Sequence, residues 1–133
     1  MTMLRPMTMA DADKMLEWKN YEETRRFAIQ SHEEIKREDH IKFLEKNLDQ
    51  FQVIMAGGLL VAGAVRVNGM EVSIWIDREF RKQGLALKTI NQISFKGMFA
   101  RIVSTNIPSL RTFIRAGFLP NSFNGTYYLF EKQ

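Results

Sequence analysis

The sequence predicts a single α/β (α+β) domain over residues 1–133, built on one mixed β-sheet. A length of 133 residues fits one domain, and neither a repeat nor a Pro/Gly-rich linker divides the chain. Hydrophobic residues make up 45% of it, which is enough for a core. The predicted elements come as helices, then an antiparallel meander, then alternating strands and helices, and this order indicates a mixed sheet.

The N-terminal part of the chain predicts a short strand followed by helices. Residues 3–5 suit a strand, and Thr8 with Asp11 resembles a helix cap. Residues 21–28 form a second short helix or an irregular turn. Ser31-His-Glu-Glu34 has the pattern of a capping box, and an apolar stripe follows it, so we expect a helix over residues 31–48.

The middle of the chain predicts three antiparallel strands. Residues 51–55 carry an apolar side chain at every second position, as a strand does. Gly57-Gly58 predicts a tight turn, and residues 59–67 form a second apolar strand. Asn68-Gly69 predicts a hairpin, because both residues tolerate positive φ. Residues 70–77 alternate between apolar and polar side chains, which indicates the third strand.

The C-terminal part predicts helices that alternate with strands. A helix begins at Gly84 or Ala86, and residues 99–103 form the next strand. Asn106 is a good N-cap and Gly117 is a natural C-terminal stop, so another helix lies between them. The remaining strand candidates are residues 118–119 and 126–130.

The charge balance is mildly basic, with 19 Lys and Arg against 15 Asp and Glu and a net charge of +4. This excess suits an anionic small ligand, and it equally suits an ordinary solvated surface. The basic residues are scattered and do not form a stripe interleaved with aromatic residues. We therefore do not expect a nucleic-acid partner.

The composition also argues against several other classes of protein. There is no cysteine, hence no disulfide framework, thiolate metal site or cysteine nucleophile, and no residue cluster has metal-ligand spacing. No apolar run approaches the roughly 20 residues of a membrane span, and the N-terminus lacks the apolar segment of a secretory signal. We expect a cytoplasmic protein with no metal and no membrane partner.

The most informative segment joins the third strand of the meander to the following helix. It contains Arg81-Lys-Gln-Gly84-Leu-Ala86. A helix N-terminus exposes unpaired backbone N–H groups, and these together with the helix dipole favour a phosphate. Gly84 lets the backbone approach a ligand closely, and Arg81 and Lys82 add positive charge. The alternative is a plain strand–turn–helix connection with surface cations. The segment is neither a P-loop nor a GxGxxG fingerprint.

Three motifs in the same order resemble the GNAT superfamily of N-acetyltransferases. The first is the strand followed by Arg81-Lys-Gln-Gly84-Leu-Ala86, the family's Arg/Gln-x-x-Gly-x-Gly/Ala pattern. The second is the helix and strand that run from Asn106 to Phe118. The third is the opening, with Leu4-Arg5-Pro6 and later Glu17-Trp-Lys-Asn20. This opening resembles the ribosomal-protein N-terminal and nucleotide-amino-sugar acetyltransferase branches.

The resemblance implies a mixed sheet of six to seven strands flanked by about four helices, with a splayed parallel pair at residues 72–76 and 99–103. Acetyl-CoA would lie in this V-shaped opening, with its pantetheine arm along the backbone of the first strand. The amides of residues 82–86 would hold the pyrophosphate. The residues expected to bind the cofactor are Ile74, Trp75, Ile76, Arg81, Lys82, Gln83, Gly84, Leu85, Ala86, Asn106, Ser109 and Phe113.

Acetyl transfer by direct attack needs a neutral amine and a polarised thioester carbonyl. Glu71 lies on the polar face of its strand, so we expect it to act as the base, directly or through water, with Ser73 as a proton relay. The alternative for Glu71 is an exposed strand carboxylate. Phe113 departs from the family pattern, because many members have a tyrosine there that would protonate the thiolate.

The segment that walls the acceptor site in related proteins corresponds here to Trp18, Asn20, Arg25 and Arg26. Trp18 would stack on a base or sugar, and an arginine would meet a diphosphate. The alternative is a core tryptophan with surface arginines. We expect the acceptor to be a primary amine of a small molecule, with a nucleotide-linked amino sugar as the favoured example. A protein N-terminus as acceptor, a non-catalytic CoA-binding module and a homodimer all stay open.

Overall fold

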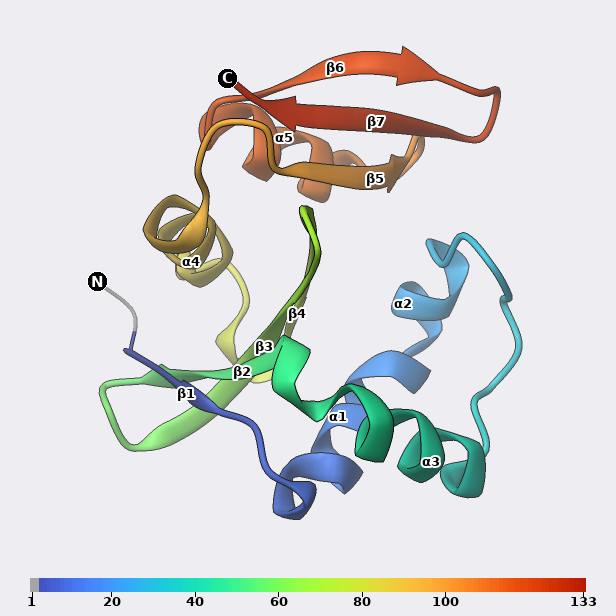
Figure 1. Cartoon of the computed structure of the whole chain (residues 1–133), viewed down its shortest axis with the longest axis vertical. Coiled ribbons are helices and arrows are strands. Elements are labelled where there is room, and N and C mark those ends of the chain that lie inside the picture. Colours follow the sequence, from blue (N-terminus) through green and yellow to red (C-terminus); the bar gives the residue numbers. More distant parts are fainter. Residues whose placement is uncertain (1–2) are drawn as a thin grey trace.

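A seven-stranded mixed sheet forms the centre of the computed structural model, which describes residues 3–133. The strand order is β1-β2-β3-β4-β5-β7-β6, and all neighbouring strands are antiparallel except β4 and β5 (Figure 1). The mixed sheet expected from the sequence is therefore confirmed. The strands are β1 (Met3–Pro6), β2 (Phe51–Ala56), β3 (Leu60–Asn68), β4 (Glu71–Ile76), β5 (Phe99–Val103), β6 (Phe118–Phe123) and β7 (Tyr127–Lys132).

Five α-helices and three short 3₁₀ segments surround the sheet in the described residues, one α-helix more than expected. Thr8 caps the first 3₁₀ segment through the predicted pairing with Asp11, and Asn106 caps the last helix. The helices are α1 (Ala12–Asn20), α2 (Glu22–Arg26), α3 (Arg37–Asn47), α4 (Leu85–Ile93) and α5 (Ile107–Arg115), and the 3₁₀ segments are η1 (Met9–Asp11), η2 (Leu48–Gln50) and η3 (Arg78–Phe80). No described helix is both long enough and apolar enough to cross a membrane.

The prediction of a helix over residues 31–48 is wrong at its start, because α3 begins only at Arg37. The Ser31 hydroxyl accepts from the Glu33 amide at 3.1 Å, which makes a local turn instead of a capping box. The Asn20 side chain occupies both backbone groups of Ile35: it accepts from the N–H at 2.8 Å and donates to the carbonyl at 3.0 Å. Residues 27–36 therefore run as a non-helical connection between α2 and α3.

Glycines set two features of the meander. Gly57 and Gly69 have φ of +60° and +62° in the turns that join β2 to β3 and β3 to β4. The Asn68-Gly69 hairpin is confirmed, although only the glycine of the pair has positive φ. Gly63 serves a different purpose, since a Cβ there would lie 2.2 Å from the carbonyl oxygen of Trp75. The close approach of β3 to β4 thus requires a residue without a side chain at this position.

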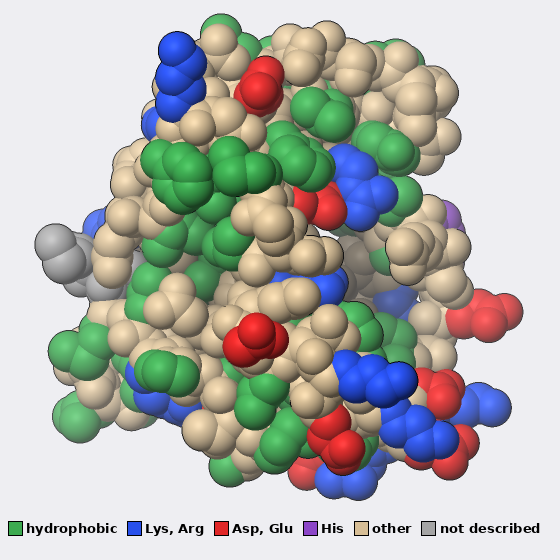
Figure 2. Space-filling view, viewed as in Figure 1, with side chains coloured by type: hydrophobic (Ala, Val, Ile, Leu, Met, Phe, Trp, Pro, Cys, Tyr) green, Lys and Arg blue, Asp and Glu red, His purple; other side chains and the backbone are tan. Residues whose placement is uncertain are grey.

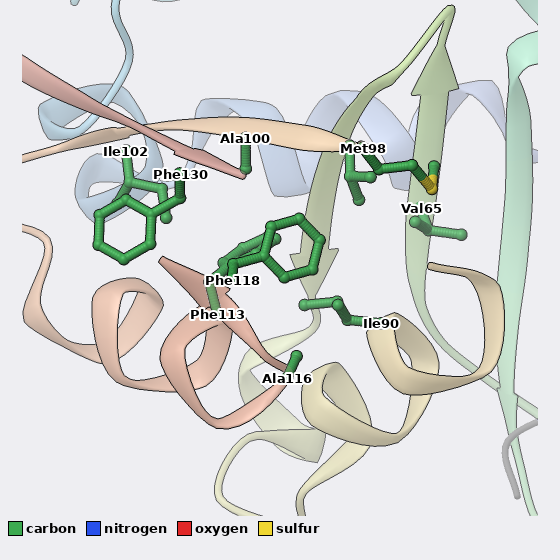
Figure 3. Close-up of a cluster of buried hydrophobic side chains, with 10 residues drawn as sticks. Val65, Ile90, Met98, Ala100, Ile102, Phe113, Ala116, Phe118 and Phe130 are labelled. Carbon is green, nitrogen blue, oxygen red and sulfur yellow. The ribbon is translucent and has the colours of Figure 1, made fainter. Parts of the chain in front are cut away.

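The two faces of the sheet carry separate cores. Successive strand residues point to opposite faces, so Ala64 and Val65 lie in different clusters. On the face with Val65, α4 and α5 cover a core that includes Ile90, Phe113 and Phe118 (Figure 3). On the face with Ala64, α1 and α3 cover β2 and β3 (Figure 1). The odd-numbered residues of β4, which include Trp75, point to this second face.

Candidate active site

The parallel strands β4 and β5 separate after a single pair of residues. Glu71 pairs with Phe99, whose N–H donates to the Met70 carbonyl at 2.8 Å. From Val72 onward, β4 pairs only with β3 in the described chain. The edge of β4 that faces β5 therefore keeps backbone donors and acceptors with no strand partner. The splayed parallel pair expected from the sequence is present, and an extended ligand can pair with this edge.

A buried aspartate fixes the turn that follows β4. Asp77 is 4% exposed, and its carboxylate accepts from the Glu79 amide at 2.9 Å and from the indole N–H of Trp18 at 3.0 Å. Burial raises the pKa of Asp77, but these hydrogen bonds and Lys14 outweigh it, so the pKa lies below its ordinary value. The ionised carboxylate caps η3 and anchors it to α1.

The turn then enters α4 through two residues in the left-handed region. Lys82 has φ of +63° and Gly84 has φ of +76°, and Gly84 is the N-cap of α4. The first amides of a helix have no intrahelical acceptor, and no side chain caps them here. A Cβ on Gly84 would meet no atom within 4 Å, so the space beside these amides is open. Uncapped amides, a positive helix end and open space suit a diphosphate.

One carboxylate of α2 ties that helix to the same turn. Glu23 accepts from Arg78 at 2.7 Å and from Arg81 at 2.8 Å (Nη–Oε distances). The hydrogen bond from Arg78 is the largest of the effects that hold the pKa of Glu23 well below its usual range. The guanidinium of Arg78 also lies 3.9 Å from the centre of the Tyr21 ring. Arg81 therefore stands beside the open amides with its charge shared with Glu23.

The second face of β4 carries the side chains expected to act on the acceptor. Glu71 and Ser73 lie on this face, and both are half-buried. The two carboxylate oxygens of Glu71 accept from Arg101 on β5, at 2.6 Å and 3.2 Å. Figure 2 shows the molecule hollowed at one side between its upper part, which carries β5–β7, and its lower part, which carries the N-terminal helices (Figure 1).

The other residues expected at the cofactor fall into three groups. Arg81, Lys82, Gln83 and Gly84 are exposed, and Leu85 and Ala86 are half-buried in the first turn of α4. Asn106 and Ser109 lie together because the Asn106 side chain accepts from the Ser109 amide at 3.4 Å. Phe113, by contrast, is 3% exposed and packs edge-on against Phe118 with ring centres 5.0 Å apart.

Comparison with known families identifies the fold. The family model described as "Acetyltransferase (GNAT) domain" matches residues 2–119, which is most of the chain. This protein belongs to the GNAT acetyltransferase family. The sequence-based prediction of an acyltransferase is confirmed at this level, whereas the branch within the family is not. No curated protein sequence matches this GNAT chain.

Solved structures agree on the fold. A Vibrio cholerae spermidine N-acetyltransferase in complex with CoA and spermine superposes with a TM-score of 0.79 at 14% identity, covering 98% of this chain and 92% of that one. A Salmonella typhimurium putative acetyltransferase with acetyl-CoA gives 0.72 at 18% identity, covering 98% and 91%. A domain from Methanocaldococcus jannaschii gives 0.77 at 20% identity, covering 98% and 97%. These identities establish the architecture.

The structure corrects the expectation that Trp18 stacks on an acceptor. Its ring is 1% exposed and lies in the core between α1 and the sheet, with its N–H on Asp77. A large aromatic side chain on the inner face of an amphipathic helix is buried by the sheet it covers. The choice left open between a stacking and a core tryptophan is thereby decided in favour of the core.

The three polar residues expected on the acceptor side have different surroundings. Asn20 holds Ile35, and Arg25 donates to the carbonyl oxygens of Asn20 at 3.2 Å and His32 at 3.4 Å. These two side chains shape the segment between α2 and α3. Arg26 is exposed, and its closest carboxylate contact is Glu22 at 3.7 Å.

Sequence reasoning missed the partners of the predicted residues in this GNAT domain. Arg101 comes from β5, 30 positions after Glu71, and Glu23 lies 55 and 58 positions before its two arginines. The register of a parallel pair and the docking of α2 bring these charges together. The local sequence contains no pattern that indicates either contact.

Proposed function

We propose that this GNAT protein transfers the acetyl group of acetyl-CoA to the primary amine of a small molecule. One observation carries the proposal: the opening between β4 and β5 lies on the same strand that leads to the uncapped N-terminus of α4. A long ligand with a diphosphate at one end and an amide-containing arm at the other fits both features. The complexes of the similar structures with CoA and acetyl-CoA support this assignment.

The chain's own groups would hold the cofactor in three places. The amides of residues 82–86 would bind the diphosphate, with Arg81 and Lys82 beside them. The edge of β4 at Ile74 and Ile76 has no strand partner and would pair with the pantetheine arm, in place of the hydrogen bond that Arg81 Nε donates to the Ile76 carbonyl at 3.3 Å. When bound, acetyl-CoA supplies a thioester whose carbonyl carbon is open to attack by an amine. A β4 amide in this opening would donate to the carbonyl oxygen.

Glu71 is the proposed base, because it lies on the acceptor face where β4 and β5 begin to separate. Its pairing with Arg101 orients the carboxylate and keeps it in place. Each oxygen keeps a lone pair beside its bond to Arg101, so the proton of the attacking amine reaches Glu71 directly, through a water or through Ser73, which follows on the same face. Phe113 is buried and has no proton to give, so the departing thiolate receives none from this position.

The acceptor is proposed to be a small amine, with a nucleotide-linked amino sugar as the favoured example. The opening of the sequence resembles that branch, and the spermidine acetyltransferase shows the same architecture in complex with a small amine. The primary test is isothermal titration calorimetry with CoA, followed by a thiol-release assay with acetyl-CoA and a panel of small amines. N-terminal peptides form a second panel.

The matched pair Gly84→Val and Gly57→Val sharpens the calorimetry. The two glycines have φ of +60° and +76°, so a side chain strains the backbone to a similar degree at either position. A Cβ at either position also meets no atom within 4 Å. Only the Gly84 side chain would occupy the proposed diphosphate site. We expect Gly84→Val to weaken CoA binding by about tenfold or more, or about 1.4 kcal/mol, and Gly57→Val to leave it unchanged.

Each outcome separates the possible functions. Binding of CoA with thiol release on small amines supports the proposal. Turnover restricted to N-terminal peptides moves the activity to the protein-acetylating branch. Binding with no turnover of either panel indicates a non-catalytic CoA-binding module. Equal CoA affinity in wild type and Gly84→Val contradicts the proposed diphosphate site.

A further inference from the structure

Two cationic side chains lie over one aromatic cluster on the acceptor face. The cluster consists of Phe43 on α3, Phe51 on β2 and Trp75 on β4. The Lys19 ammonium is 4.3 Å from the ring centre of Phe43 and 5.7 Å from that of Phe51. The Arg66 guanidinium is 5.0 Å and 5.4 Å from the same two ring centres. Lys19 and Arg66 therefore occupy one small region, although they are 47 positions apart in the sequence.

Neither cation has a carboxylate partner among the described residues. None of the ion pairs within 4.0 Å in this part of the chain includes Lys19 or Arg66. The Nε of Arg66 donates to the neutral side-chain oxygen of Gln50 at 2.8 Å. Arg101, which is also half-buried, has Glu71 as its partner. Two half-buried like charges that form no ion pair cost the fold stability, and a bound anion would offset that cost.

The pKa shifts in this region are those of two neighbouring cations whose repulsion a bound anion would relieve. Burial, and next to it repulsion from Arg66, lower the pKa of Lys19 to about 8. Burial also lowers the pKa of Arg66. The other titratable groups that influence them are Glu71, whose charge acts to raise the pKa of Arg66, and His40, whose own pKa is lowered by burial and by Lys19. An oxyanion placed between Lys19 and Arg66 would replace this repulsion by attraction.

The register of the sheet places these cations next to the proposed reaction centre. Arg66 stands directly opposite Ser73 in the β3–β4 pair, and opposed residues point to the same face. Trp75, whose ring the Lys19 ammonium approaches to 5.8 Å, follows on that face of β4. Glu71, Ser73 and the two cations thus lie on the acceptor side of one strand pair.

We propose that the acceptor amine carries an oxyanion, a carboxylate or a phosphate, and that Lys19 and Arg66 bind it. This inference rests on the proposed acetyltransferase function and specifies its substrate class. The amine would face Glu71 and Ser73, and the oxyanion would face the cation pair. A polycation such as the spermine bound to the structurally similar enzyme would meet two like charges here. The inference thus favours anionic amines over polyamines.

Matched substrates test the charge preference directly. Glucosamine 6-phosphate is compared with glucosamine, and amino acids are compared with their amides, so that only the oxyanion changes. We expect kcat/KM to be about tenfold or more higher for the anionic member of the preferred pair. A higher kcat/KM for glucosamine 6-phosphate than for glucosamine would identify a phosphate as the oxyanion. A higher kcat/KM for the amino acids than for their amides would identify a carboxylate. Equal kcat/KM within both pairs would overturn the inference.

Variants test whether Lys19 and Arg66 produce the preference for anionic amines. Lys19→Gln and Arg66→Gln should each reduce the anionic-to-neutral ratio of kcat/KM by about tenfold, mainly through a higher KM for the anionic amine. Lys19→Arg should retain the ratio. Lys46→Gln, which removes an exposed lysine of α3, is the matched control and should change nothing. A ratio unaffected by both glutamine variants would reject these residues as the anion site.

A binding measurement keeps the test independent of turnover. The Lys19 side-chain NMR resonance, assigned by its loss in Lys19→Arg, is titrated with inorganic phosphate at constant ionic strength. Phosphate binding should raise the pKa of Lys19, and Arg66→Gln should suppress the response. No response in the wild-type protein would overturn the anion site. CoA calorimetry is separate, so failure there removes the acetyltransferase proposal while this titration still judges the cation pair.

Discussion

Replacing Lys19 by methionine should stabilise the protein at neutral pH. The folded structure lowers the pKa of Lys19 from 10.5 to about 8. At about 1.4 kcal/mol for each pKa unit, this corresponds to about 3 kcal/mol that the charged form costs the fold. The cation–π contact with Phe43 recovers about 1 kcal/mol. Methionine keeps an unbranched apolar side chain among the rings, so we expect a gain of about 2 kcal/mol in the free energy of unfolding.

The pH dependence of this gain has a definite sign. Because the pKa of Lys19 is lower in the folded than in the unfolded state, the unfolded state binds more protons between about pH 8 and pH 10.5. The full cost is present below pH 8, and it disappears as the pH rises through this window. Wild type should therefore gain stability relative to Lys19→Met over that range, and the difference between them should narrow.

Urea unfolding of wild type, Lys19→Met and Lys46→Met at pH 7 and pH 10 measures both effects. The exposed Lys46 reports what loss of a lysine does without burial. The reasoning is refuted if Lys19→Met is less stable than wild type at pH 7, or if the difference between the two is the same at both pH values. If Lys19 also belongs to the anion site, Lys19→Met should lose the preference for anionic amines while it gains stability. Such a trade is expected where a functional residue destabilises the fold.

Two further substitutions test other parts of the structure. Gly63→Ala should destabilise the protein by about 3 kcal/mol or more, because its Cβ would lie 2.2 Å from the Trp75 carbonyl oxygen. The control Gly57→Ala has no neighbour in contact with the new Cβ and should cost only about 1 kcal/mol of backbone strain. Equal urea midpoints for the two variants would contradict the close approach of β3 to β4. Glu71→Gln should lower kcat/KM by about 100-fold or more. Urea unfolding of that variant measures separately what loss of the Glu71–Arg101 pair costs the fold, and an unchanged kcat/KM would exclude Glu71 as the base.

Local patterns predicted the elements where one physical signal dominated. The hairpin at Asn68-Gly69 and the strand over residues 99–103 were found because turn chemistry and alternation act over a few residues. The predicted helix over residues 31–48 starts too early, because the Ser31 pattern takes account only of neighbouring residues, whereas Asn20 hydrogen-bonds Ile35 from 15 residues away. A capping motif indicates a helix only where no distant side chain takes the same backbone groups.

The candidate site divides in the same way. The turn at Gly84 was predictable, because left-handed backbone and exposed helix amides depend on a few consecutive residues. The splaying of β4 from β5 was expected only through the family resemblance, and the single register contact between Glu71 and Phe99 was not predicted. The cation pair of Lys19 and Arg66 was not predicted, because nothing in the local sequence states which face of the sheet a lysine of α1 reaches.

The sequence by itself determined the family, the order of the elements and the phosphate-type turn, since each depends on short-range geometry and on residue types at fixed spacing. Tertiary structure alone decided that Trp18 is buried, that Glu71 is paired with Arg101, and that Lys19 and Arg66 share an aromatic cluster. These contacts join residues 15 to 59 positions apart in the chain. Charge partners and burial depend on which surfaces meet after folding, and only the packed sheet brings those surfaces together.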